Sequence, residues 1–150
     1  MYRLGKYEAN DPMSDLVCGN YPILPVMSRF GIALGFGDRT IGQVCRDRGV
    51  DTDTFLTVVN LLLDEEKQNA EKDYVFSVGA LLDYLHKSHD YFLGFRFPAI
   101  RCKLVAAIDC SADVSQAILR YYDEYADEVQ KHMTYEERTV FPYVRDLLAG

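Results

Sequence analysis

The sequence predicts an all-α protein: a small N-terminal helical module, residues 1–64, followed by a long antiparallel helical hairpin, residues 74–150. Three observations favour this class. The chain has 150 residues, 49% of them hydrophobic, enough for one domain, or one small domain with an appendage, and a core. Apolar residues recur at intervals of three and four, the period of helices buried on one side. Only 10 Gly and 5 Pro occur, so the composition is not that of a disordered tail.

The first module is predicted as several short helices separated by turns. Glycine, proline and capping residues mark their ends. The charged run at 64–73, poor in apolar residues, is expected to be a linker or an exposed helix end. In chain order the helices are expected from Pro12, capped by Asp11, to Gly19; over 21–30, ending at Gly31; from Thr40 to Arg48, closed by Gly49; and from a cap at Asp51 or Thr52 through Leu62.

Two long amphipathic segments form the predicted hairpin. The turn at 109–113 between them is short enough to make them antiparallel neighbours. Pro98 is expected to kink the first segment or to mark a break in it. Each segment carries one stripe at helical spacing, made of Val78, Leu82, Leu85, His89, Leu93, Phe97, Ile100, Leu104 and Ile108 in the first, and of Ile118, Tyr122, Tyr125, Val129, His132, Glu136, Val140, Tyr143 and Leu147 in the second.

Composition argues against several functional classes. Sixteen Lys and Arg against 23 Asp and Glu leave a net charge of -7, which disfavours a nucleic-acid surface. No apolar run reaches the roughly 18 residues of a membrane helix, and the polar start lacks a secretory signal, so a cytoplasmic protein is expected. The four cysteines lack Cys-x-x-Cys spacing and are expected to be reduced and buried, with a redox or ligand role as the alternative. No catalytic triad, paired catalytic acids or phosphate loop is present, which disfavours a hydrolase or nucleotide enzyme.

Three residues of the stripes are candidate metal ligands. His132 and Glu136 are four residues apart, so their side chains share one helix face, and His89 lies mid-stripe on the facing helix. A carboxylate among apolar residues needs a compensating partner. Two imidazoles and one carboxylate suit iron, manganese or zinc, so a metal site is chemically sensible.

Structural roles for the same residues stay open at this point. A core histidine often bonds a backbone carbonyl or a tyrosine instead of a metal. Glu136 could pair with Arg138 or Lys131, or lie at the stripe's edge. His86 lies toward the flank, where an outer or surface role is favoured over ligation.

The His-x-x-His-Asp element at 86–90 and the His-Met-x-x-Glu-Glu-x-x-x-Phe-Pro pattern at 132–142 resemble the first two helices of hemerythrin-like (cation-binding) domains. The repair-of-iron-centres proteins are the most similar. The resemblance implies a non-haem di-iron centre in a four-helix bundle, with His89 as the first-helix ligand, His132 as the second-helix histidine and Glu136 as the bridging carboxylate. It also implies a response to oxygen, nitric oxide or peroxide, or repair of iron–sulfur clusters.

Residues 21–50 are similar to the small helical module that precedes the bundle in those proteins. The family's cysteine pair, usually found just after the Gly-Ile, is missing after Gly31 and Ile32, so the resemblance does not extend to thiol chemistry in this module. The third and fourth bundle helices are also missing, so we expect a homodimer to complete the bundle around one two-metal site. The alternative is a metal-poor helical sensing or dimerisation module of a longer regulatory protein.

Overall fold

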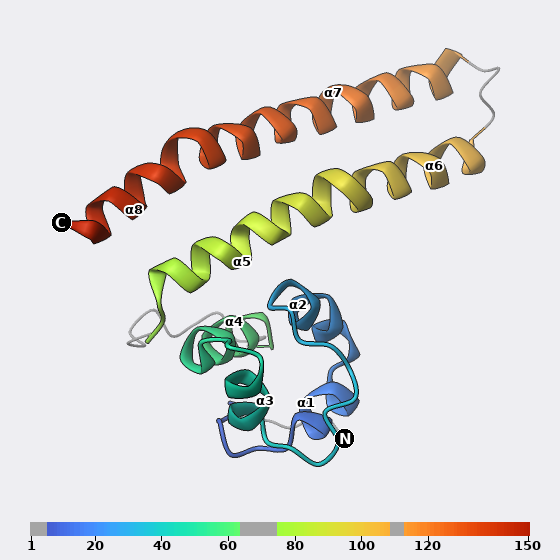
Figure 1. Ribbon diagram of the computed structural model, residues 1–150. Coiled ribbons are helices and arrows are strands. Elements are labelled where there is room, and N and C mark those ends of the chain that lie inside the picture. The colour runs from blue at the N-terminus through green and yellow to red at the C-terminus, as the bar shows by residue number, and fades with distance from the viewer. Residues whose placement is uncertain (1–5, 64–74, 109–112) are drawn as a thin grey trace. The chain divides into compact units, whose positions relative to one another are not determined.

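The computed structural model describes residues 6–63, 75–108 and 113–150 (Figure 1). Every regular element in these ranges is helical, so the predicted all-α class is confirmed. The chain forms two compact units, Met1–Tyr84 and Leu85–Gly150. The predicted linker at 64–73, and the predicted turn apart from Asp113, lie outside the described residues. Within the described ranges, no helix has the length and apolar character needed to cross a membrane.

The core of the first unit is built from short helices that each bury one side. The Phe30 ring lies between two others, edge-on to Phe55 at 5.3 Å between centroids and stacked on Tyr84 at 4.7 Å. Phe55 itself is completely buried. The helices are α1 (Met13–Gly19), the 3₁₀ turn η1 (Tyr21–Ile23), α2 (Leu24–Arg29), α3 (Ile41–Asp47) and α4 (Thr52–Leu63).

Most predicted helix ends of this unit agree with the structure, with two corrections. Helix α1 is preceded by Pro12 in the capping position, because the Asp11 carboxylate instead accepts a hydrogen bond from the Glu8 backbone N–H. The helix expected over 21–30 is divided into η1 and α2. Pro25 has no N–H to donate to the carbonyl four residues earlier, so a continuous α-helix cannot form there.

Helix α3 has the predicted signals at both ends. The Thr40 hydroxyl accepts a hydrogen bond from the Gln43 N–H, while the Gln43 side chain accepts one from the Thr40 N–H, which is a capping box. At the other end Gly49 has φ of +66°, and the Val50 N–H donates to the Cys45 carbonyl. A left-handed residue at this position is easiest for glycine, so the chain turns away at the predicted point.

Asp51 caps helix α4, as one of the two predicted alternatives. Its Oδ1 accepts hydrogen bonds from the Thr54 N–H at 2.8 Å and the Thr54 hydroxyl at 2.6 Å. These hydrogen bonds lower the pKa of Asp51 below its ordinary value of 3.8. The cap is therefore strongest when the carboxylate is ionised.

We expect Asp51→Ala to reduce the free energy of unfolding by about 1 kcal/mol at neutral pH, as is typical of a lost N-cap. Since the folded-state pKa is lower than the unfolded one, the cap stabilises the protein above about pH 4, and this contribution disappears as the pH falls through the folded pKa. Urea unfolding of both proteins between pH 3 and pH 7 measures the difference. A difference that grows toward low pH would contradict this role; the exposed Asp53→Ala is the control.

The predicted burial of the cysteines is correct for one of the three that the structure describes. Cys45 is buried, which raises the pKa of its thiol to about 11. Cys18 and Cys102 are exposed, so the expectation that they are buried is wrong, although both are free thiols. Cys18 lies about 200° around α1 from the buried Leu16, so it is on the opposite side of that helix. Cys102 is on α6, which has no buried residue. Cys110 lies outside the described residues.

Longer helices make up the second unit. Its first helical segment begins in the first unit, because the boundary between Tyr84 and Leu85 falls inside α5. Each segment contains one wide π-helical turn. The elements are α5 (Val78–Tyr91), the π turn η2 (Phe92–Arg96) and α6 (Phe97–Ala107), then α7 (Asp113–Tyr135), the π turn η3 (Glu136–Val140) and α8 (Phe141–Ala149).

Both π turns come directly before a Phe-Pro pair. The Phe97 N–H donates to the Phe92 carbonyl and the Phe141 N–H to the Glu136 carbonyl, five residues back in each case. Pro98 and Pro142 follow, and neither can donate the next α-helical hydrogen bond. The break predicted at Pro98 is thus present as a change of helix type; the equivalent break before Pro142 was not predicted.

Side-chain contacts join the two segments of this unit, which run side by side in Figure 1. Arg101 on α6 binds Asp123 on α7 through two hydrogen bonds of 2.7 and 2.9 Å. This pair, which is half exposed, lowers the pKa of Asp123. The Tyr122 hydroxyl donates to the Phe97 carbonyl at 2.8 Å. These contacts, with those of the site below, keep α5–α6 next to α7–α8.

Candidate functional site

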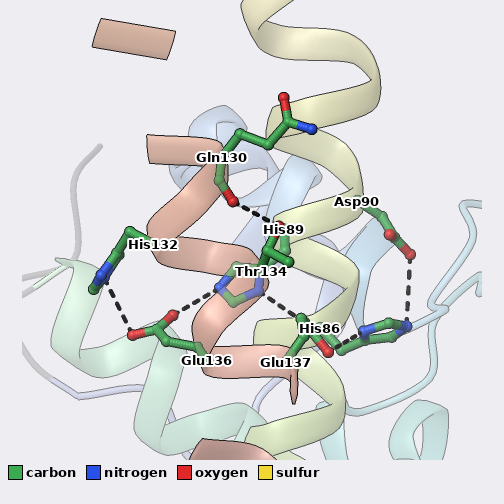
Figure 2. Close-up of polar contacts among 8 residues, drawn as sticks. All are labelled: His86, His89, Asp90, Gln130, His132, Thr134, Glu136 and Glu137. Atoms are coloured by element: carbon green, nitrogen blue, oxygen red, sulfur yellow. Dashed lines mark hydrogen bonds and ion pairs between the residues drawn. The ribbon is translucent and has the colours of Figure 1, made fainter. Parts of the chain in front are cut away.

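The three predicted ligand residues lie close together, because His89 and His132 both contact the carboxylate of Glu136 (Figure 2). His89 lies near the end of α5, His132 near the end of α7, and Glu136 is the first residue of the π turn η3. Glu136 Oε2 lies 3.3 Å from His89 Nε2, and Glu136 Oε1 lies 3.3 Å from His132 Nε2. Each carboxylate oxygen therefore faces one imidazole nitrogen.

The two imidazoles differ sharply in exposure. The side chain of His89 is 10% exposed, and its ring stacks on Phe141 at 5.5 Å with an interplanar angle of 17°. The His132 side chain is 69% exposed. The prediction that His132 occupies a core position is therefore wrong within a single chain. No residue of α7 is buried there. The His89 ring is therefore packed on one face, whereas the His132 ring is mostly surrounded by solvent.

A second carboxylate, not singled out from the sequence, lies beside the first. Glu137 Oε1 is 2.8 Å from His89 Nδ1, and Glu137 Oε2 is 2.9 Å from His86 Nδ1. Since an ionised carboxylate only accepts hydrogen bonds, both Nδ1 atoms donate. His86 is 53% exposed and its Nε2 lies 3.8 Å from Asp90 Oδ2, which agrees with the predicted place at the flank.

The position of Phe141 was also missed, because the stripe was continued at α-helical spacing from Glu136 to Val140 and Tyr143. In an α-helix, residues five apart point about 140° apart. The π turn η3 is closed by a hydrogen bond across five residues. The wider turn places Phe141 on the same side of the helix as Glu136. Phe141 is 4% exposed, whereas Val140 and Tyr143 are 37% and 63% exposed. Pro142, which directly follows Phe141, was the signal in the sequence that could have indicated this shift.

Taken one imidazole–carboxylate pair at a time, the donor atoms have the spacing of two ligands of one metal ion. Two ligand atoms at about 2.1 Å from one ion, at angles of about 90–110°, are about 3.0–3.4 Å apart, which includes the 3.3 Å of both imidazole–carboxylate pairs. As they stand, however, no three His, Cys, Asp or Glu side chains in the described ranges are grouped so that they could hold an ion. The predicted alternative pairing of Glu136 with Lys131 is not formed, since Lys131 binds Asp127 and Glu128.

Comparisons with protein-family models, with curated proteins and with solved structures find no match to this chain. The site is therefore interpreted from its own chemistry. That chemistry is a buried imidazole with a fixed ring, an exposed imidazole and two neighbouring carboxylates.

Proposed function

We propose that this chain is a hemerythrin-like non-haem iron protein in which His89, His132 and Glu136 bind the metal. The observation that supports the proposal is the Glu136 carboxylate, which has one oxygen facing each imidazole Nε2 at 3.3 Å. Bound iron would supply redox chemistry and an open position for dioxygen, nitric oxide or peroxide. The proposed role is sensing of these molecules, or repair of iron–sulfur clusters, ahead of a turnover enzyme.

His89 and His132 would contribute to metal binding in different ways. A neutral imidazole has only one N–H, so when His89 Nδ1 donates to Glu137, the lone pair of Nε2 is directed at Glu136 Oε2, where a cation between the two atoms would be stabilising. A metal ion is such a cation. The His132 side chain is mostly exposed, so it can change rotamer and bind an ion together with Glu136. A buried side chain would have less room to do so.

The direct test is metal analysis with an optical spectrum. Protein purified without oxygen and reconstituted with ferrous iron should retain iron in stoichiometric amount after desalting and, on exposure to oxygen or peroxide, develop absorption in the near ultraviolet and visible. The same protein loaded with manganese or zinc measures selectivity. Iron that is removed completely by desalting would refute the proposal.

We propose further that a second copy of the chain completes the site. One chain offers three proposed ligands, two imidazoles and one carboxylate, whereas the implied centre needs about twice that set. The second unit also leaves apolar side chains of the α7–α8 stripe uncovered, including Ile118 at 43%, Tyr125 at 54% and Leu147 at 64% exposed. Two such units related by a two-fold axis would cover each other's stripes and form a four-helix bundle.

Ile118→Asp is expected to convert the dimer to a monomer, because it places a charge in the proposed apolar interface. Light scattering on the iron-loaded protein should give twice the 17.1 kDa chain mass for the wild type and the single mass for the variant. Gln116→Asp is the matched control, since it adds the same charge about 200° around the same helix. A wild-type chain that is a monomer when iron is bound would exclude the dimer.

A metal-free function is the second candidate, and one observation favours it. The existing contacts satisfy His86 and His89 through Glu137, and no three-ligand group is preformed in the described ranges. In that case the second unit would be a sensing or dimerisation module of a regulatory protein. It would form the same dimer but retain no iron after desalting, so metal analysis of the dimeric protein separates the two candidates.

A further inference from the structure

We infer that Glu137 is a positioning residue, which fixes the tautomer and the ring of His89 so that Nε2 is presented unprotonated toward Glu136. The purpose of this arrangement rests on the proposed metal site. The arrangement itself is a property of the metal-free chain and can be measured there.

The contacts of His89 distinguish its two ring nitrogens. Nδ1 lies 2.8 Å from Glu137 Oε1, which is an optimal hydrogen-bond length, whereas Nε2 lies 3.3 Å from Glu136 Oε2. A neutral imidazole with a single N–H gains most by placing it on Nδ1. The lone pair of Nε2 is then directed at the site.

Burial and stacking hold the rest of the ring. The His89 side chain is 10% exposed and Phe141 covers its face, so the ring plane is fixed by packing and its rotation by Glu137. Glu137 is anchored in turn, because its other oxygen accepts a hydrogen bond from His86 Nδ1 at 2.9 Å. Figure 2 shows this series of contacts from His86 through Glu137 to His89.

The π turn explains how neighbouring residues of one helix can both reach the same imidazole. Glu136 and Glu137 are the first two residues of η3, and Phe141 follows it directly. The wider turn gathers the two carboxylates and the covering phenylalanine on the side that faces α5. Carboxylates that hold the second nitrogen of a metal-binding histidine commonly change metal affinity about 10–100-fold when they are removed.

Nitrogen-15 NMR of histidine side chains in the full-length, metal-free protein tests the arrangement, at a pH high enough to make the imidazoles neutral. We expect wild-type His89 to carry its proton mainly on Nδ1. Glu137→Ala should shift the population toward Nε2–H, while Glu137→Gln, which retains an acceptor oxygen, should keep the wild-type tautomer. Glu128→Ala is the matched control, because Glu128 is an exposed glutamate on α7 that binds only Lys131 among the contacts described for it.

Iron titration of the same four proteins supplies the second measurement. Glu137→Ala should weaken binding about 10–100-fold, with Glu137→Gln less affected and Glu128→Ala unchanged. Wild-type His89 found mainly as Nε2–H, or a tautomer unaffected by Glu137→Ala, would overturn the inference. If no variant and no wild type binds iron, the proposed function fails, yet the NMR result still decides whether Glu137 sets the tautomer.

Discussion

His132→Ala is expected to abolish stoichiometric iron binding while leaving the fold intact. The side chain is 69% exposed on a helix and alanine is a good helix former, so the substitution should change the free energy of unfolding by less than about 0.5 kcal/mol. Loss of a direct ligand should lower iron affinity by more than about 100-fold, since loss of a ligand's partner already costs about 10–100-fold. Metal analysis after desalting, together with circular dichroism, measures both effects.

Gln130→Ala is the control for this experiment, because Gln130 is an exposed residue on the same helix two positions away. It should bind as much iron as the wild type. If His132→Ala retains its iron, His132 is a surface residue and the ligand set must be sought elsewhere. The experiment is informative because an exposed histidine without a ligand role has no reason to affect metal content.

Phe55→Ala is expected to have the largest effect on stability, lowering the free energy of unfolding of the first unit by about 3–5 kcal/mol. The Phe55 side chain is completely buried and packs edge-on against Phe30, so alanine would leave a cavity and remove an aromatic pair. Urea unfolding followed by circular dichroism gives the difference between variant and wild type.

Tyr21→Ala provides the comparison, since Tyr21 is also aromatic and in the first unit but is 74% exposed. Its effect should stay within about 0.5 kcal/mol. A loss below about 1 kcal/mol for Phe55→Ala would show that this part of the chain is not organised around the Phe30–Phe55–Tyr84 cluster.

Local chemistry explains why much of the fold could be predicted. Thr40 and Asp51 cap their helices through hydrogen bonds to residues three positions away, and Gly49 ends α3 by adopting a positive φ. These interactions depend on a few neighbouring residues, so a sequence pattern is sufficient. The pairing of His132 with Glu136 is of the same kind, because a spacing of four residues places both on one face.

Errors arose where a feature depended on what packs against a helix. Cys18 and Cys102 lie in helices of apolar pattern but face outward, which periodicity cannot reveal. The helical register beyond Glu136 was also wrong, since a single π turn moves Phe141 into the place expected for Val140. A change of one residue in helical register rotates the following side chains by about 100°, so different side chains face the neighbouring segment.

The sequence by itself determined the helical class, most helix ends and the shared helix face of His132 and Glu136, because each depends on spacing along one chain. Only the tertiary structure decided that the His89 ring is buried against Phe141, that Glu137 holds its Nδ1, and that His132 remains exposed. Those facts depend on residues about 50 positions apart meeting across two helices, at distances set by packing and by the π turn.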